Sequence, residues 1–543
     1  MGVTEASRRS PSIESYLQAF GPVPDWEHLP RWPPDVFALT NIVLDYTEAY
    51  RLAVAPPRGR QWPPTPDWDA QVTRAARRWR DVTGAGTGPL PRMVRDSWEV
   101  VSRYRDVPMS DLRPDDPWAL WAALITLHAL ADEACAGLAA STVDGASAPF
   151  EARAWTMLSE RGTLARISSD RIKVLPKTHF TVRGITVRSL SRYLALSYEA
   201  VDLRWRRIDA GPPLSARPGL EIPDHTYTLL VPWPLRVASD AFRPVTGPLR
   251  NMDQAAFGFF EFVPDAPLDL ALIRGLIAAA RRKAPRIDAM ILPEASVEPH
   301  EIPAIEAELA GSDVTFLFAG VRRRAFDGGF GRNYIHLGIH TDAGWQHVEQ
   351  DKHHRWCLDG PQIRQYHLTR SLDPNRLWWE AIELPGRSVQ VLDLGAGRTS
   401  VPLVCEDLAR MDEVMELLRR IGPAIIIALL LDGPQVAGRW PCRYASILAE
   451  EPGSAVLTLT SFGMAARSRP PGMRRSRVVG HWHDRAGGPH EIELARGASG
   501  ILITGTTLHR TVWTADGRRH EAGAPDLILS SVDQLRVPGV AHA

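Results

Sequence analysis

The segment Pro402-Leu403-Val404-Cys405-Glu406-Asp407 decides the fold expected of this chain. An apolar run that is typical of a buried strand ends at Cys405, and a helix is expected to begin soon after it. The earlier run Ile291-Leu292-Pro293-Glu294 ends in the same way at an acid, and Lys352 follows another predicted strand. Lys352 is one of only four lysines in 543 residues. Placement of all three residues at strand ends predicts that they converge at one pocket.

These three residue types suit the hydrolysis of an amide-like bond through a covalent intermediate. Cysteine is the strongest side-chain nucleophile near neutral pH, and a neighbouring base makes it effective. Glu294 could supply that base and Lys352 a cation for the oxyanion that develops. The simpler interpretation of Cys405 is a small buried apolar residue.

The order Glu294, Lys352, Cys405 resembles the catalytic set of nitrilase-like carbon–nitrogen hydrolases, and the resemblance covers roughly residues 222–510. It implies an α/β fold, a four-layer α-β-β-α sandwich. It also implies that Cys405 is the nucleophile, that Glu294 is the base, and that the Glu406 N–H and the Lys352 ammonium bind the oxyanion. The implied substrate is a small amide-like molecule, and neither a metal nor an organic cofactor is required.

The chain departs from the family pattern between Lys352 and Cys405, where the interval is long and contains Trp378-Trp379-Glu380. We interpret that tripeptide as part of an inserted loop. Family members often carry a second glutamate soon after the lysine. Here Asp359 is the acid nearest to that place, and we expect it to stand in for the glutamate. The resemblance further implies a homodimer, with an apolar stripe in 411–420 (Val414, Leu417 and Leu418) as a candidate surface.

Three regions are expected along the chain. Residues 1–215 form a mainly helical domain of unassigned role, 222–510 form the sandwich, and 511–543 form a C-terminal tail. The clearest helix of the first domain begins at Asp116-Pro117, an N-cap followed by proline at the first helical position. It carries His128, Asp132 and Glu133, for which a polar helix edge is favoured over a metal site.

Two other motifs have alternative interpretations. The segment 189–208 has the apolar rhythm of a helix-turn-helix with several arginines, which would contact DNA phosphates, although a surface segment closing the first domain is favoured. The segment 391–397 resembles the glycine motif of methyltransferases. Because another apparent strand follows at once, a hairpin turn is favoured there.

Composition narrows the classes of function that remain possible for this chain. A formal net charge of +0 gives no global attraction to nucleic acid or membranes, and four scattered cysteines fit a reducing cytoplasm. No apolar run approaches the length of a membrane span. The segments 229–235 and 427–434 look similar to nitrilase-like domains associated with bacterial antiviral reverse transcriptases. The alternative function is therefore an effector or scaffold in bacterial antiviral defence, acting with a partner protein or nucleic acid.

Overall fold

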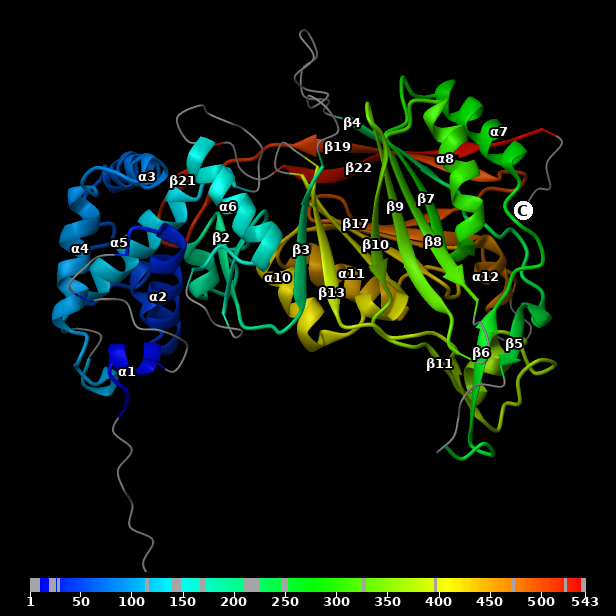
Figure 1. The fold of residues 1–543 in the computed structure, drawn as a ribbon, viewed down its shortest axis with the longest axis horizontal. Helices are drawn as coiled ribbons and strands as arrows, with labels where there is room; N and C mark the ends of the chain where they lie inside the picture. Colours follow the sequence, from blue (N-terminus) through cyan, green and yellow to red (C-terminus); the bar gives the residue numbers. More distant parts are fainter. Residues whose placement is uncertain are drawn as a thin grey trace, which may run out of the picture.

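Two stacked seven-stranded sheets form the centre of the protein in the computed structural model (Figure 1). Helices cover their outer faces, so the four-layer α-β-β-α sandwich is confirmed. A mainly helical domain packs at one end. The structure describes residues 10–18, 26, 30–112, 117–138, 148–166, 172–208, 225–245, 252–324, 329–394, 398–469, 474–521 and 525–538.

The first sheet has parallel strands at its centre and antiparallel strands at its edges. Its spatial order is β10 (Gly344–Asp351), β9 (Arg332–Thr341), β8 (Phe316–Arg323), β7 (Ala289–Val297), β4 (His225–Leu230), β19 (Gly500–Leu508) and β22 (Asp526–Leu535). Helices α7 (Leu270–Arg281) and α8 (Ile302–Ala310) pack on its outer face. Asp269 is the N-cap of α7, and its side chain accepts a hydrogen bond from the Ala271 N–H.

The second sheet carries the nucleophile candidate. Its order is β18 (Gly488–Glu493), β17 (Val478–Asp484), β16 (Ala455–Thr460), β15 (Ile425–Leu430), β14 (Thr399–Val404), β13 (Ser388–Asp393) and β3 (Asp202–Arg207). The continuous apolar run of β15 fits its central position, where both faces are buried. β13 and β14 pair antiparallel, which supports the hairpin over a methyltransferase motif, although 395–397 lie outside the described residues.

Helices α10 (Glu416–Ile421), α11 (Trp440–Glu450) and α12 (Phe462–Arg467) belong to the second half of the sandwich. A π-helical turn, Met411–Met415, leads into α10. Val414, Leu417 and Leu418 are all at most 1% exposed. The prediction that this stripe offers a dimer surface is therefore wrong, because its apolar side chains pack inside this chain.

A smaller four-stranded sheet lies beside the sandwich, at the lower right of Figure 1. It consists of β11 (Cys357–Leu358), β12 (Leu377–Glu380), β6 (Phe257–Phe262) and β5 (Phe242–Val245). Helix α9 (Gly360–Gln365) follows β11 in the chain. Aromatic side chains from this sheet form a separate core with Leu431 and Ala295. The supposed inserted loop at 378–380 is thus part of strand β12, and its Glu380 bonds Lys352.

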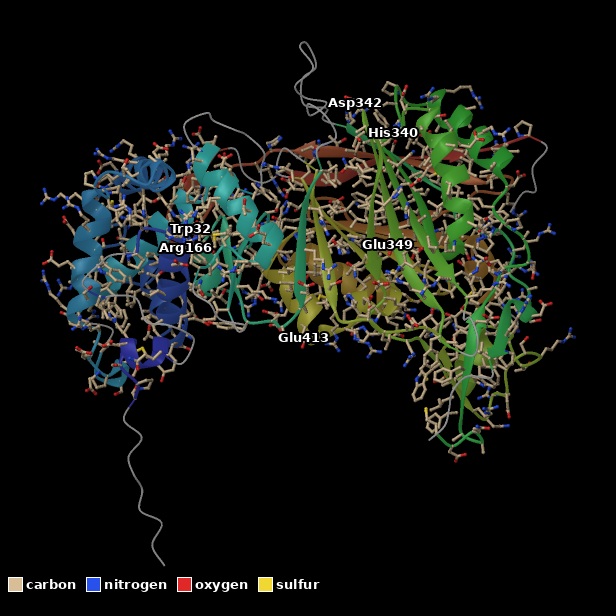
Figure 2. All side chains as sticks on the ribbon, in the orientation of Figure 1. Trp32, Arg166, His340, Asp342, Glu349 and Glu413 are labelled. Atoms are coloured by element: carbon tan, nitrogen blue, oxygen red, sulfur yellow. The ribbon has the colours of Figure 1, made fainter. Side chains whose placement is uncertain are left out.

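The N-terminal domain is mainly helical, as predicted. Its helices are α1 (Ile13–Gln18), α2 (Pro33–Tyr46), α3 (Trp68–Ala85), α4 (Arg92–Arg103), α5 (Trp118–Ala134) and α6 (Ala148–Arg161), and a two-stranded sheet, β1 (Lys173–Pro176) and β2 (Leu194–Ser197), adjoins them. α5 is buried on nearly every side, which its apolar sequence predicted. The Arg166 guanidinium lies over the Trp32 ring at 4.8 Å (Figure 2).

The segment 189–208 does not form a helix-turn-helix. A short 3-10 helix (Val187–Leu190) is followed by β2 and then by β3, which joins the second sheet through parallel pairing with β13. The β-branched and aromatic residues of this segment are compatible with a strand as well as with a helix, and pairing with β13 decides between the two. The sandwich therefore begins before residue 222.

Residues 511–543 are more than a tail. β22 pairs with β19 at the sheet edge, and the hairpin of β20 (Val512–Trp513) and β21 (Arg519–His520) reaches the N-terminal domain. Arg518 lies between β20 and β21 and is 0% exposed. Its guanidinium bonds the carboxylates of Asp516, Asp132 and Glu133 at 3.0 to 3.1 Å. The two acids on α5 thus hold an arginine, and His128 instead contacts Thr40.

Replacing Arg518 by Met should lower the free energy of unfolding by about 3–5 kcal/mol, because three carboxylates would lose their buried cation. Urea denaturation of the whole chain measures this change. Arg519→Met is the matched control, since its side chain is 51% exposed beside Glu521 and should change stability by no more than about 1 kcal/mol. Equal effects of the two substitutions would show that the network does not join the domains.

Among the described residues, no helix combines the length and apolarity needed to cross a membrane.

Candidate active site

Glu294 lies in an irregularity of strand β7 that turns its side chain into the sandwich. The register between β7 and β8 shifts between Leu292 and Val297, and Ala295 adopts a left-handed φ of 53°. The close approach of the two strands depends on Gly320, because a Cβ there would lie 2.1 Å from the Pro293 carbonyl oxygen. The bulge places a glutamate inside a segment whose sequence otherwise reads as a plain buried strand.

Lys352 follows β10 and is 1% exposed. Its Nζ donates to Glu294 Oε1 at 2.7 Å and to Glu380 Oε2 at 2.6 Å. Asn333 Nδ2 donates hydrogen bonds to the same two acids, to Glu294 Oε1 at 2.7 Å and to Glu380 Oε1 at 2.6 Å. The Leu431 N–H donates to the other Glu294 oxygen at 2.5 Å. One ammonium and one amide therefore fix two buried carboxylates in a rigid arrangement.

Cys405 stands where β14 ends and a short 3-10 helix, Cys405–Leu408, begins. Its φ of 47° is left-handed, which for a non-glycine residue indicates a strained turn of the kind found at functional sites. The first N–H groups of such a helix, including that of Glu406, have no partner within the helix. Glu406 itself turns its carboxylate to Arg410, at 2.5 Å.

Asp407 joins the cysteine turn to the lysine loop. Its carboxylate accepts hydrogen bonds from the His353 N–H at 3.0 and 3.2 Å and lies 2.8 Å from His354 Nδ1. Asp407 is 1% exposed, so these bonds form away from water. Because His353 follows Lys352 directly, Asp407 fixes the position of the ammonium relative to the thiol.

The charges of the three predicted catalytic residues act on one another. Burial raises the pKa of Glu294, an effect that Lys352 opposes and Glu380 increases. Burial alone would lower the pKa of Lys352, but the Glu294 and Glu380 carboxylates raise it well above its ordinary value. Burial also raises the pKa of Cys405, where Glu294 raises it further and Lys352 opposes. Lys352 and Glu294 thus act on the pKa of the Cys405 thiol in opposite directions.

The second acid at Lys352 is Glu380 rather than Asp359. Asp359 caps helix α9 instead, accepting a hydrogen bond from the Gln362 N–H at 2.8 Å. Glu380 comes from the end of β12, where pairing with β6 carries it back to the lysine. Sequence reasoning missed Glu380 and Asn333, although an acid that ends an aromatic strand was a signal comparable to that of Glu294.

A further acid, Asp432, directly follows Leu431, whose N–H bonds Glu294 just beyond β15. Asp432 is 5% exposed, and its Oδ1 bonds Tyr366 Oη and, at 2.7 Å, the Arg439 guanidinium. Among the described residues its Oδ2 has no hydrogen-bond partner. Asp432 also contributes to the raised pKa of Cys405, so its charge acts on the thiol.

No family model matches this chain, and no curated protein matches it. Among solved structures, a glutamine-dependent NAD⁺ synthetase from Acinetobacter baumannii has a TM-score of 0.30 at 13% identity, covering 52% of this chain and 45% of its own. This chain thus spans less than half the length of that synthetase.

Two smaller proteins are covered almost completely. An amidase from Nesterenkonia sp. with an acetamide moiety on its active-site cysteine has a TM-score of 0.29 at 13% identity, over 51% of this chain and 89% of its own. A branch 10 nitrilase-superfamily protein from Saccharomyces cerevisiae has a TM-score of 0.28 at 14% identity, over 58% and 90%. With scores this low, only the residues of this chain bear on its function.

Proposed function

We propose that this protein is a cysteine-dependent hydrolase of a non-peptide carbon–nitrogen bond, with an amide-like small molecule as substrate. The observation that carries the proposal is the buried Lys352 ammonium, bonded to Glu294 and Glu380 and electrostatically coupled to Cys405. An ammonium, a carboxylate with a raised pKa and a thiol at a strained turn are the groups that acyl transfer through a thioester needs.

In the proposed first half-reaction, the Cys405 sulfur attacks the carbonyl carbon and the thiol proton passes to Glu294. The raised pKa of Glu294 makes it a stronger base than an ordinary carboxylate, because the proton it accepts is held more tightly. The developing oxyanion is stabilised by the Lys352 ammonium and the Glu406 N–H. Collapse breaks the carbon–nitrogen bond, and Glu294 returns the proton to the departing amine.

In the second half-reaction, Glu294 removes a proton from water as the water oxygen attacks the thioester carbon. Collapse of this tetrahedral intermediate breaks the carbon–sulfur bond and releases the acid, and Glu294 gives its proton to the sulfur, which restores the Cys405 thiol. If an amine or alcohol took the place of this water, the same residues would catalyse acyl transfer. Glu380 and Asn333 contribute by position, since they hold Lys352 and Glu294 in one geometry throughout both steps.

Asp432 supports a substrate that carries an N–H donor. Its buried Oδ2 lacks a partner among the described residues, and an unpaired buried carboxylate oxygen is costly in free energy. A primary amide could donate to this oxygen while its carbonyl oxygen faces Lys352. This arrangement favours an amide over a nitrile, which has no N–H.

A panel of small primary amides, nitriles and matched esters tests the proposal, with ammonia release as the readout for the first two. We expect at least one primary amide to release ammonia with the wild-type chain and none to do so with Cys405→Ala. Activity should fall as the pH drops through the raised pKa of Glu294, because the protonated acid cannot accept the thiol proton. Ammonia release that persists in Cys405→Ala would refute the assigned nucleophile.

Two further expectations stay predictions. A homodimer would give a species near twice 60.2 kDa in light scattering. The antiviral alternative, in which the fold serves recognition of a partner protein or nucleic acid, would be supported by a neighbouring reverse transcriptase gene.

A further inference from the structure

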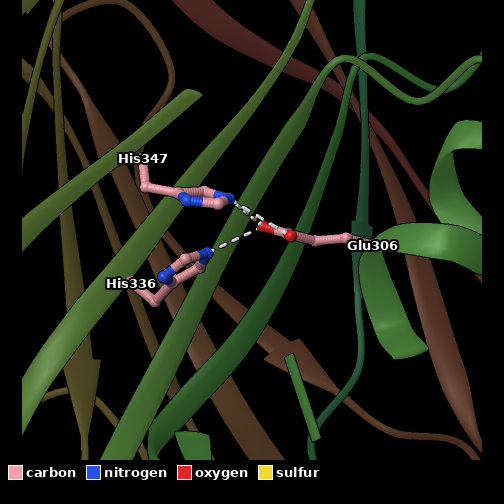
Figure 3. A group of neighbouring side chains, drawn as sticks. All are labelled: Glu306, His336 and His347. Carbon is pink, nitrogen blue, oxygen red and sulfur yellow. Dashed lines mark hydrogen bonds and ion pairs between the residues drawn. The ribbon is translucent and has the colours of Figure 1, made fainter. Parts of the chain in front are cut away.

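Three potential metal ligands converge on the outer face of the first sheet. Glu306 comes from α8, His336 from β9 and His347 from β10. Both imidazoles direct Nε2 at the Glu306 carboxylate (Figure 3), with 2.8 Å from His336 to Oε1 and 3.1 Å from His347 to the same oxygen. The ligand atoms of all three residues lie within 4.8 Å of one another.

This cluster is separate from the catalytic residues. Side chains alternate along β9, so His336 and Asn333 face opposite sides of the sheet. Asn333 points inward to Glu294, whereas His336 points outward to α8. Loss of a ligand here should therefore leave the catalytic geometry intact.

The packing around Glu306 leaves room for its carboxylate. Glu306 is 6% exposed, although a glutamate on an outer helix would normally reach solvent. Gly338, directly opposite His347 in the β9–β10 pairing, makes this possible, because a Cβ there would lie 2.7 Å from Glu306 Oε1. This buried carboxylate bonds two imidazoles, and no lysine or arginine of the described residues pairs with it.

We propose that Glu306, His336 and His347 bind a divalent transition-metal ion, Zn²⁺ above all. Two imidazole nitrogens and one carboxylate are a ligand set that zinc sites use, with the fourth position left to water. Ligand atoms about 2.0–2.2 Å from a tetrahedral zinc lie roughly 3.3–3.6 Å apart. Glu306 Oε1, now 2.8 Å from His336 Nε2, therefore needs to move away from it by about half an ångström. The His347 side chain is 49% exposed, which gives the ion a route from solvent.

The bound ion would join α8 to the β9–β10 hairpin. At present two hydrogen bonds hold these elements together at this point. Replacing them by three metal–ligand bonds ties a helix and two strands to one centre, so binding should stabilise the folded chain by mass action. The proposal is independent of the hydrolase reaction, which uses none of these residues.

Calorimetric titration of the chelator-treated full-length protein with Zn²⁺ tests the site. We expect one ion per chain and a concentration-dependent rise in melting temperature. His347→Ala should weaken the affinity by at least about 10-fold and so reduce that rise at a given Zn²⁺ concentration. The His347 side chain is half exposed, which makes misfolding of this variant a minor concern. Glu306→Gln should have a similar effect, because a neutral amide is a poor ligand for zinc.

His340→Ala is the matched control, since His340 lies on the same strand and face but outside the cluster (Figure 2). The affinity of the His340→Ala variant for Zn²⁺ should equal that of the wild-type chain. Co²⁺ substitution adds a second readout, because its visible spectrum distinguishes tetrahedral nitrogen and oxygen ligation from loose binding. Wild-type protein that binds no Zn²⁺ at micromolar concentration, or a His347→Ala variant that binds it unchanged, would overturn the proposal.

Discussion

Replacing Cys405 by Ala should lower turnover of any amide that the protein hydrolyses by at least about 10³-fold, because no other group can form the thioester. Folding should change little. Alanine and cysteine are both L-residues with a side chain at Cβ, so the left-handed φ of 47° strains each to a similar degree. Loss of one sulfur should lower the free energy of unfolding by about 1 kcal/mol, which thermal melts can measure.

Cys442→Ala is the matched control for this substitution. Cys442 is as buried as Cys405, at 3% exposure, and its Sγ lies 3.5 Å from the Gln435 carbonyl oxygen. The two variants should lose similar stability, yet only Cys405→Ala should lose activity. If both kept full activity, Cys405 would be a core residue and the fold would serve recognition.

Alkylation rates can distinguish recognition of an amide at Cys405 from simple solvent exposure of a thiol. Cys357 is the more exposed thiol and should react with any small haloacetyl reagent, whereas Cys405, at the proposed substrate site, should distinguish between reagents. Iodoacetamide carries an amide that can donate to Asp432, whereas iodoacetate, of nearly the same size, has no N–H to donate. The ratio of Cys405 to Cys357 labelling, measured by mass spectrometry, should therefore be higher with iodoacetamide. Equal ratios would indicate that Cys405 does not lie in an amide-binding pocket.

Local sequence signals predicted the elements on which the site stands. The apolar runs before Glu294 and Cys405 are the buried strands β7 and β14, and the run at β15 lies between parallel neighbours. Such runs are informative because a strand buried on both faces is mostly apolar along its length. The same patterns placed Lys352 correctly after β10, whereas Glu294, which was expected at a strand end, lies at a bulge inside β7.

Long-range pairing explains what the sequence did not reveal. Glu380 reaches Lys352 only because β12 pairs with β6, more than a hundred residues earlier in the chain. β3 likewise becomes a strand through pairing with β13. Short amphipathic segments fit a helix or a strand equally well, so a distant partner decides their conformation. Asp359 was misassigned for a related reason, since nearness in sequence to Lys352 did not bring its carboxylate to the ammonium.

Replacing Lys352 by Met should lower the free energy of unfolding by about 3–5 kcal/mol at neutral pH and turnover by about 10²-fold or more. The substitution keeps much of the side-chain volume but leaves Glu294 and Glu380 buried side by side without their cation. Among the described residues, Asn333 would then be the donor that both acids share. Urea denaturation measures the loss. Lys283→Met is the control, because the Lys283 side chain is 42% exposed and its pair with Asp533 contributes at most about 1 kcal/mol.

Acidification should restore part of the stability of Lys352→Met. The folded-state pKa of Glu294 is already raised by burial with Lys352 present, and removing that ammonium raises it further. A carboxyl group with a raised folded pKa binds a proton more tightly when folded, so the folded state gains stability as the pH falls through that pKa. Adding Glu380→Gln should likewise restore stability at neutral pH, because one buried charge is removed. A variant that stays equally unstable in both tests would show that Lys352 contributes packing rather than charge.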